Sequence, residues 1–362
     1  MKKQKKILII CPYPQNTAPS QRLKYEQYFE HFKKNRYDIT VAPFMHQNLW
    51  QIVYKKGNFF KKLLYTIWGY WQRFLLLLTV GRYDIVYVHL WATPFGLPLY
   101  ESILCLLSKK IVYDIDDMIF LGRSSKYQQW TQFFKGKLKI VYLIKHSGKV
   151  IVSTTALQNF AQYYNNRVYL IHCTINSHNY PYVYKPYDGG TFIIGWMGSH
   201  STSHYLKLIE KQLYGLTLKN IPFEVWIVGD TEFKFDVDIP YKTFPWSEHT
   251  ELEFLSRMHV GIYPLPNDPW IMGKSGGKLR QYMSCGIPPI ATDTPVNREI
   301  IENGVNGILI PFDNPDSWTD VIEDLFKNPD KLMQLSQNAR KTIESKYSTD
   351  VYAPVYLSVL ND

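Results

Sequence analysis

The sequence of 362 residues lacks the short motifs that identify several common classes of enzyme. It contains no G-x-G-x-x-G fingerprint, which argues against a dinucleotide-dependent dehydrogenase, and it contains no Walker motif. Its four cysteines are scattered without C-x-x-C or metal-ligand spacing, so they indicate reduced, mostly structural thiols of a cytosolic protein. Internal repeats and low-complexity tracts are also absent. The function therefore has to be sought in other motifs.

The sequence also gives no sign of a signal peptide or of a membrane-spanning helix. The start, MKKQKK, is followed directly by an apolar run that is too short for a signal peptide and predicts a first strand over residues 6–11. The apolar stretch within residues 54–80 is interrupted by Gln72 and Arg73. A spanning helix needs about 20 apolar residues with few charges, so this stretch is not expected to cross a membrane.

What the chain does have is apolar content and positive charge. Hydrophobic residues make up 46% of it, enough to bury a large core and more in keeping with two domains than with one. Lysine and arginine number 41 against 31 acidic residues, and the net charge of +10 favours acidic partners such as nucleotide sugars, an anionic membrane surface or nucleic acid. The basic residues cluster with Trp and Leu instead of forming a groove-reading motif, so no nucleic-acid partner is expected.

Apolar runs alternate with helical patterns in two halves of the chain, which predicts two Rossmann-like domains that face a cleft. A patternless stretch over residues 174–190, aromatic and containing Pro and Gly, predicts the interdomain linker. We therefore expect an N-terminal domain over residues 1–173 and a C-terminal domain over residues 191–346.

Residues 264–307 are the stretch around which the rest of the chain is organised. A buried strand at residues 260–263 precedes a Gly/Lys loop, and a helix is expected from about residue 279. Backbone N–H groups and the positive end of the helix dipole then point outward, and glycine lets a phosphate approach the backbone. Lys274 and Lys278 add cationic donors, so the loop predicts a cradle for a nucleotide diphosphate. The loop residues are Gly273, Lys274, Ser275, Gly276, Gly277 and Lys278.

This block resembles the donor-binding half of the family 4-like, or group 1, glycosyltransferases, which have the GT-B fold. The matching features are PLPNDPW, the K-x-x-x-K-L pair, QYMSCGIPPIAT and the run NREIIENG-x-NG. The resemblance implies transfer of a sugar from a UDP- or GDP-sugar to a hydroxyl of a saccharide or lipid-linked saccharide, with retention of configuration and without a metal or resident cofactor. It also implies a role in bacterial surface polysaccharide biosynthesis, donor binding in the second domain, and a last segment, residues 347–362, that crosses back to the first domain.

The block departs from the family pattern at two positions. Much of the family has two glutamates eight positions apart, contacting the donor sugar and the ribose, and these fall on Gly273 and Gln281 here. Gln281 can still bond a ribose hydroxyl, whereas Gly273 has no side chain to contact the sugar. A subgroup with lysines is the nearer match, which favours a phosphate role for Lys274. Glu299 keeps the position of the family's third acidic residue.

The second half contains a further loop of small residues where a strand ends. Residues 192–196 form the expected strand, and Gly198, Ser199 and Ser201 follow where many relatives have an arginine and a lysine for the donor phosphates. Backbone N–H and hydroxyl donors are expected to replace those side chains. Gly229 ends the strand that the resemblance places near the base. Trp246 is a candidate for stacking on the base, with a core position as the alternative.

In the first half, three carboxylates stand just past the end of an apolar strand within residues 110–120. They are Asp114, Asp116 and Asp117, and in the family this strand often ends in a His-Asp pair whose places fall on Asp116 and Asp117. Crowded carboxylates have raised pKa values and can accept the proton of an acceptor hydroxyl. Capping of the next helix and metal binding are the alternatives, although D-x-D-D is not a full ligand set.

Ser20 and Arg22 follow a strand and a proline-rich loop, so they are expected either at the acceptor side of the cleft or as a capping serine and a solvated arginine.

The segment over residues 55–80 mixes lysines with aromatic residues and predicts a helix in the membrane interface, with one face packed on the protein. We therefore expect a cytoplasmic protein, peripheral on the inner face of the membrane. Its lysines are Lys55, Lys56, Lys61 and Lys62.

The sequence leaves two other functions open. A nucleotide-sugar epimerase of GT-B type would make product without an acceptor. A catalytically silent saccharide-binding subunit, suggested by the missing glutamates, would bind the donor without transferring or hydrolysing it.

Overall fold

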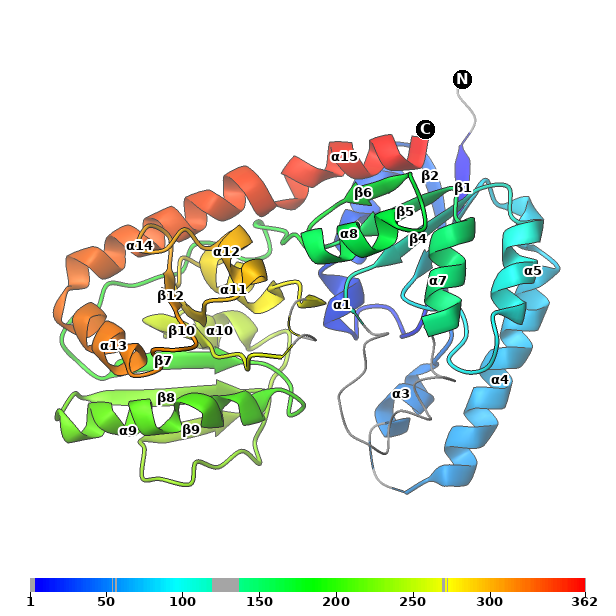
Figure 1. Ribbon diagram of the computed structural model, residues 1–362. Coiled ribbons are helices and arrows are strands. Elements are labelled where there is room, and N and C mark those ends of the chain that lie inside the picture. The colour runs from blue at the N-terminus through cyan, green and yellow to red at the C-terminus, as the bar shows by residue number, and fades with distance from the viewer. Residues whose placement is uncertain are drawn as a thin grey trace. The chain divides into compact units, whose positions relative to one another are not determined.

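The computed structural model describes residues 4–53, 55, 57–118, 137–268, 271 and 273–361. The chain divides into two compact units (Figure 1). The first contains residues 1–173, 273–275 and 352–362, and the second contains residues 174–272 and 276–351. Each unit has its own six-stranded sheet with helices on it, so the predicted fold class of two Rossmann-like domains is confirmed.

The sheet of the first unit has the strand order β2-β1-β3-β4-β5-β6, and every pairing in it is parallel. Parallel strands are covered by helices on both faces, which is why strands such as Ile85–His89 are buried along their whole length. One core cluster contains Leu8 and Ile10 and the other contains Ile7 and Ile9, as the alternation of side chains along a strand requires. The strands are β1 Lys5–Cys11, β2 Tyr37–Pro43, β3 Ile85–His89, β4 Ile111–Ile115, β5 Lys149–Val152 and β6 Val168–Leu170.

Helices of the first unit follow the strands in alternation. After the first loop the chain forms α1, a 3-10 turn and α2 in succession, and Lys24 and Tyr25, between α1 and the 3-10 turn, are buried in the core. The elements are α1 Pro19–Arg22, η1 Glu26–Tyr28, α2 Phe29–Lys34, α3 Gln47–Val53, α4 Phe59–Leu77, η2 Val80–Arg82, α5 Leu99–Leu107, α7 Lys137–His146 and α8 Thr155–Gln162.

The second unit repeats the design with the order β12-β11-β10-β7-β8-β9, again entirely parallel. Its strands are β7 Phe192–Met197, β8 Phe223–Val228, β9 Tyr241–Phe244, β10 Val260–Tyr263, β11 Pro289–Thr292 and β12 Ile308–Ile310. Its helical elements are η4 Ser203–Ile209, α9 Glu210–Leu218, α10 Glu251–Leu255, α11 Gly277–Ser284, α12 Pro295–Ile300, α13 Ser317–Lys327, α14 Pro329–Thr342 and the π-helical turn η6 Ile343–Tyr347.

Residues 174–190, expected as a linker, pack into the second unit. Tyr180 and Tyr184 are buried in its two core clusters. Ile175 pairs with the start of the last helix, α15 (Thr349–Asn361), because its amide donates to the Tyr347 carbonyl and its carbonyl accepts from the Thr349 amide. The segment is therefore part of the folded unit, although it has little regular secondary structure.

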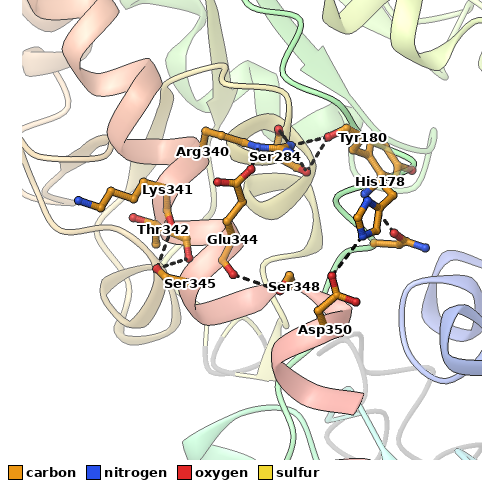
Figure 2. Close-up of polar contacts among 11 residues, drawn as sticks. His178, Tyr180, Ser284, Arg340, Lys341, Thr342, Glu344, Ser345, Ser348 and Asp350 are labelled. Carbon is orange, nitrogen blue, oxygen red and sulfur yellow. Dashed lines mark hydrogen bonds and ion pairs between the residues drawn. The ribbon is translucent and has the colours of Figure 1, made fainter. Parts of the chain in front are cut away.

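Arg340 ties that segment to the end of α14 (Figure 2). Its Nη1 atom donates to the carbonyls of Tyr180, at 2.6 Å, and Ser284, at 2.5 Å, and its Nε atom pairs with Glu344 at 2.6 Å. A single guanidinium thus joins α11, α14 and the 174–190 segment. Nearby, the exposed His178 and Asp350 lie 3.1 Å apart (Figure 2).

Helix α4 is fixed to the first sheet by Arg73, which is 2% exposed. Its Nε, Nη1 and Nη2 atoms donate to the carbonyls of Ala92, Ala42 and Cys11 at 2.8, 3.0 and 3.0 Å. These carbonyls lie at or beyond the carboxyl ends of neighbouring strands. One turn earlier, Gly69 lets the helix approach Phe44, because a Cβ there would lie 2.8 Å from the Phe44 ring. The arginine that interrupts the apolar run therefore points inward.

We predict that Arg73→Met lowers the free energy of unfolding by about 3 kcal/mol or more, because it removes three hydrogen bonds from a buried charged donor, each worth about 1.5–3 kcal/mol. The matched control is Arg82→Met, since Arg82 is exposed and such substitutions stay within about 0.5 kcal/mol. Urea unfolding of both variants measures the difference. Equal stability of the two variants would contradict the anchoring role of Arg73.

Candidate functional site

In the second unit, the site is defined by the point at which the strand order reverses. After β7 the chain adds β8 and β9 on one side of β7, and it then places β10 on the other side of β7. The loops that leave β7 and β10 therefore diverge at the carboxyl edge of the sheet, and ligands of open α/β sheets bind in such crevices. The loop after β7 begins at Gly198, and the loop after β10 leads to Lys274 and Lys278.

Two predicted glycines come together at this edge. Gly229 has φ +107°, and a Cβ on it would lie 2.0 Å from the carbonyl oxygen of Gly198. A Cβ on Gly198 would in turn lie 2.5 Å from Cε of Lys278. Both amides continue the strand ladder, with Gly198 donating to Val228 and Gly229 to Phe244. The glycines therefore provide close approach, and the amide of Gly198 is not an available phosphate donor.

Lys278 lies in the first turn of α11 beside these glycines. Its ammonium is 5.3 Å from the Trp196 ring centroid, 5.4 Å from the Tyr263 centroid and 3.5 Å from the Thr202 hydroxyl oxygen. The first turn of α11 contains no acidic residue, so a lysine is added to the positive end of the helix dipole. That concentration of positive charge suits an anionic ligand.

Gly276 and Gly277 begin α11. Gly276 has φ +67° at the N-cap, and a Cβ there would lie 2.3 Å from Cδ1 of Ile300, so both conformation and space require glycine. Ser199 donates to or accepts from the Ser201 hydroxyl at 2.8 Å, on the loop after β7. The small residues expected at both loops thus shape the same edge of the sheet.

Gln281 is almost fully buried and has its amide nitrogen engaged. Its Nε2 atom donates to Oε1 of Glu251 at 2.5 Å and lies 3.3 Å from the Tyr180 hydroxyl, which itself donates to Glu251. The Oε1 atom is therefore the end of this amide that remains for a ligand hydroxyl. Nothing in the sequence pattern pointed to Glu251 as its partner, because the two residues are 30 positions apart.

The remaining donor candidates lie nearer the surface. Trp246 follows β9, is 40% exposed, and has its Cβ 3.6 Å from the Cβ position of Gly229. The Glu299 side chain is exposed on α12, and its carbonyl accepts from the Tyr347 hydroxyl at 2.6 Å. A stacking role for Trp246 and a donor-binding role for Glu299 stay predictions.

In the first unit, Asp114 is completely buried, with Oδ2 hydrogen-bonded and Oδ1 near a lysine ammonium. It lies on β4, 3.5 Å from Nζ of Lys24, 2.6 Å from the Tyr87 hydroxyl and 3.1 Å from Nδ1 of His89. Burial alone would raise the pKa of Asp114, but Lys24 first, then His89 and Tyr87, lower it below its usual value. This side chain, expected just past the end of the strand, therefore lies within β4 and in the protein interior.

Asp116 and Asp117 differ from Asp114 in having raised pKa values. Burial raises the pKa of Asp116, and its Oδ1 atom has no hydrogen-bond partner among the described residues. Burial raises the pKa of Asp117 to about 6, against the opposing charge of Lys274, whose ammonium is 3.9 Å away. Lys274 belongs by its contacts to the first unit, as does Gly273, where a Cβ would lie 2.6 Å from Met118.

Ser20 and Arg22 lie on α1, and both are partly buried. The helix is capped by Ala18 without a side-chain hydrogen bond, so the capping alternative for Ser20 is wrong. The loop before α1 is instead held by Gln21, which bonds the amide and carbonyl of Tyr13, each at 3.0 Å. An acceptor-side role for Ser20 and Arg22 stays a prediction.

Sequence reasoning missed Lys24 and His89, although they complete the network around Asp114. His89 is the polar end of an otherwise apolar strand, and this was the available signal. Lys24 lies in a helical pattern with other charged residues, so the sequence contained no signal that singled it out.

The outer face of α4 and α5 is apolar and exposed, and it flanks several lysines. The two helices run side by side (Figure 1), and the Tyr70 hydroxyl of α4 donates to the carbonyl of Phe95, in the loop before α5, at 3.0 Å. The expected lipid face therefore extends beyond residues 55–80. Of the four lysines expected there, Lys56 lies outside the described residues. No described helix has the length and hydropathy needed to cross a bilayer. The exposed apolar residues are Phe59, Phe60, Leu63, Leu64, Ile67, Trp68, Trp71, Phe74, Leu75, Leu78, Phe95, Leu97, Leu99, Ile103, Leu106 and Leu107.

Comparison with known proteins agrees with this geometry. Residues 271–342 match the family "Glycosyl transferases group 1". Spore coat protein SA of Bacillus subtilis (strain 168) is 35% identical over 78 residues, which are 21% of each protein. The matched stretch thus spans about a fifth of that curated relative. The family resemblance seen in the sequence is confirmed for this segment, which contains Lys274, Lys278 and Gln281.

Solved structures match the whole chain. Anabaena Alr3699/HepE in complex with UDP-glucose has a TM-score of 0.66 at 14% identity, covering 98% of this chain and 99% of that one. A glycosyltransferase from Rickettsia africae ESF-5 has a TM-score of 0.69 at 13% identity, covering 99% and 98%. At such identities the likeness shows the fold, so the predicted GT-B fold is confirmed. Fold and matched segment together define the class, a GT-B protein with a group 1 glycosyl transferase segment.

We predict that Gly229→Ala destabilises the protein more than Gly304→Ala. Both glycines have positive φ, but a Cβ at Gly304 meets nothing within 4 Å, so that variant isolates the conformational cost of about 1 kcal/mol. The alanine at 229 must in addition displace the Gly198 carbonyl. Thermal unfolding compares the two variants, and equal losses would mean that the close approach of the two loops is not required.

Proposed function

We propose that the protein transfers a sugar from a nucleotide-diphosphate donor to a hydroxyl of a saccharide or lipid-linked saccharide. The observation that carries the proposal is the carboxyl edge of the second sheet, where Gly198 and Gly229 hold two loops in backbone contact beside the ammonium of Lys278. The donor is a UDP- or GDP-sugar. The Anabaena protein HepE, solved with UDP-glucose, supports starting with UDP-glucose.

The chemistry follows from where charge develops. The bond between the anomeric carbon and the diphosphate oxygen breaks, the diphosphate leaves with the electron pair, and the acceptor oxygen forms the new glycosidic bond. Lys278 and the first turn of α11 stabilise the departing diphosphate, with Lys274 as a second cation. Gln281 accepts a hydrogen bond from a ribose hydroxyl through Oε1. Gly276 and Gly277 give the phosphates access to the backbone at the start of α11.

Asp116 or Asp117 takes the proton of the acceptor hydroxyl. A carboxyl with a raised pKa is a better base than an ordinary surface aspartate, and it is active when ionised. Retention of configuration, independence of a metal and of a resident cofactor, and a place in bacterial surface polysaccharide assembly form the part of the proposal that rests on the family resemblance alone.

The exposed face of α4 and α5 is the surface by which we propose that the protein binds the inner, cytoplasmic face of the membrane. An exposed apolar face with so many large side chains, flanked by Lys55, Lys61 and Lys62, suits the boundary between headgroups and acyl chains of an anionic bilayer. This attachment would bring the first unit to a lipid-linked acceptor.

The donor site is tested with a panel of nucleotide sugars. A ligand at 100 times its Kd stabilises the folded protein by about 2.7 kcal/mol, which is readily seen as a rise in Tm. We expect Lys278→Ala to weaken binding of the preferred donor by about tenfold or more, whereas Lys234→Ala, an exposed lysine of the same unit, leaves it unchanged. Isothermal titration with UDP and with the nucleotide sugar measures both variants.

Two outcomes separate the alternatives. Product from a nucleotide sugar without an acceptor would replace transfer by epimerisation, and binding with neither transfer nor hydrolysis would make the protein a silent saccharide-binding subunit. Full donor binding by a Lys274→Ala, Lys278→Ala protein would remove the proposed diphosphate site.

Membrane attachment is tested by flotation with vesicles that contain phosphatidylglycerol. Changing Lys55, Lys56, Lys61 and Lys62 to glutamate is expected to release the protein, because each lysine near an anionic surface contributes about 1 kcal/mol. The control changes four exposed lysines of the second unit to glutamate, with the same net charge, and should still bind. Release of both proteins would indicate only a general charge effect. The control lysines are Lys211, Lys234, Lys341 and Lys346.

A further inference from the structure

We propose that Glu251 is a positioning residue of the donor site, which fixes the side-chain amide of Gln281 so that the amide oxygen faces the nucleotide and selects a ribose over a deoxyribose. This inference rests on the proposed function, in which Gln281 accepts a hydrogen bond from a ribose hydroxyl. It adds the residue that decides which end of the amide the nucleotide meets.

Gln281 lies on α11 close to the cation proposed for the donor diphosphate. It follows Lys278 by three residues, and residues three apart are neighbours on one helix face, about 4.5 Å from each other along the axis. Lys278 itself lies at the carboxyl edge of the sheet, where a Cβ on Gly198 would be 2.5 Å from its Cε atom. Gln281 is therefore one step beyond the diphosphate, and the part of a nucleotide that follows its diphosphate is the ribose.

The amide nitrogen of Gln281 has both of its hydrogens engaged. Nε2 donates to Oε1 of Glu251 at 2.5 Å and to the Tyr180 hydroxyl at 3.3 Å. That hydroxyl donates to the same Glu251 oxygen at 3.2 Å. An oxygen that accepts from two donors carries no proton itself, so the arrangement is the same for an ionised and for a protonated carboxyl. All three residues belong to the second unit.

The same contacts exclude the opposite orientation of the amide. Turning it over would set its oxygen against the Glu251 oxygen, acceptor against acceptor, and would break both hydrogen bonds of Nε2. Glu251 is only 2% exposed, so water does not replace a lost partner there, and a buried polar group without a partner is costly. Glu251 therefore determines that the nitrogen of the Gln281 amide points inward.

Tyr180, the third member of this cluster, is itself held in place. Its carbonyl accepts from Nη1 of Arg340 at 2.6 Å (Figure 2) and from the Ser284 hydroxyl at 3.1 Å. Ser284 belongs to α11 and Arg340 to α14. The cluster that orients the amide is thus anchored on two helices of the unit.

Oε1 of Gln281 is the polar atom of this side chain that remains for a ligand, and no described residue donates to it. An amide oxygen only accepts hydrogen bonds, so the group that it recognises is a donor such as a ribose hydroxyl. A site that bonds a hydroxyl rejects the analogue without it, because the polar group of the site is then left unpaired. The cluster therefore predicts a preference for a ribonucleotide over one of its deoxy analogues.

The test is Glu251→Met, which keeps the length of the side chain and removes the acceptor. Isothermal titration uses UDP, 2′-deoxy-UDP and 3′-deoxy-UDP, or the guanosine set if GDP binds the parent more tightly. We expect the parent to bind the ribonucleotide about tenfold more tightly than one of the two analogues. In the variant the Tyr180 hydroxyl can bond either end of the amide, so the preference should fall to about twofold.

The direction of the change separates positioning from a structural role. Affinity for the ribonucleotide should fall, whereas affinity for the rejected analogue, which makes no bond to Oε1 of Gln281, should stay the same. A general disturbance of the fold would weaken both ligands equally. Glu253→Met is the matched control, because Glu253 is an exposed residue of the same helix, α10, and this variant should keep the tenfold preference.

A second measurement needs only the parent and decides the matter if Glu251→Met does not fold. The side-chain amide protons of Gln281, assigned by their disappearance in Gln281→Met, are followed by ¹⁵N NMR without ligand. We expect them to exchange with water at least about tenfold more slowly than those of Gln334, which is exposed in the same unit. Exchange as fast as that of Gln334 would mean that the amide is not held, and it overturns the proposal.

The remaining outcomes are equally decisive. Equal losses for the ribonucleotide and its analogue in Glu251→Met, or an unchanged preference, overturn the proposal and leave Glu251 a structural residue. Binding of UDP or GDP by the parent without any preference for the ribose removes this inference alone and leaves the donor site standing. If neither UDP nor GDP binds the parent, the donor site of the proposed function fails, and the inference fails with it.

Discussion

Parallel pairing is the constraint on which both units depend. When every strand runs in the same direction, every strand ends at the same edge of the sheet, and the side chains and loops that follow are brought together there. In each sheet the order also reverses once, between β1 and β3 in the first unit and between β10 and β7 in the second. Residues far apart in the chain, such as Gly198 and Lys278, therefore meet at one point.

The two units use the same topological position in different ways. In the second unit, glycines leave space at the carboxyl edge of the sheet, and the ammonium of Lys278 lies there. This arrangement suits a ligand that carries negative charge. The first unit buries charges of both signs behind its edge, with Lys24 compensating Asp114. Burying a charge without a partner is so costly that such a network persists only when its members satisfy one another. Within this network, Nε2 of His89 and the Oδ1 atoms of Asp114 and Asp116 are buried without a hydrogen-bond partner among the described residues.

Helix α4 shows how one buried cation decides which surface a helix presents. Arg73 satisfies three carbonyls beneath the helix, and the opposite face is left with large apolar side chains. A rotation of the helix would bury that apolar face but would expose or orphan the guanidinium and its acceptors. The exposed apolar face is thus a consequence of the packing, and it is the feature that suits a lipid surface.

The sequence by itself determined the strands, the two Rossmann-like halves, the glycine loops and the family of residues 271–342, because each leaves a local or periodic signal in the chain. The break between α1 and α2, the packing of residues 174–190 into the second unit, and the inward direction of Arg73 were decided only by tertiary structure. So were the partners of the site residues. Glu251 reaches Gln281, and Lys24 and His89 reach Asp114, across separations that no spacing rule covers. A lone polar residue carries no period, and its role is set by strand register and by which charges are buried beside it.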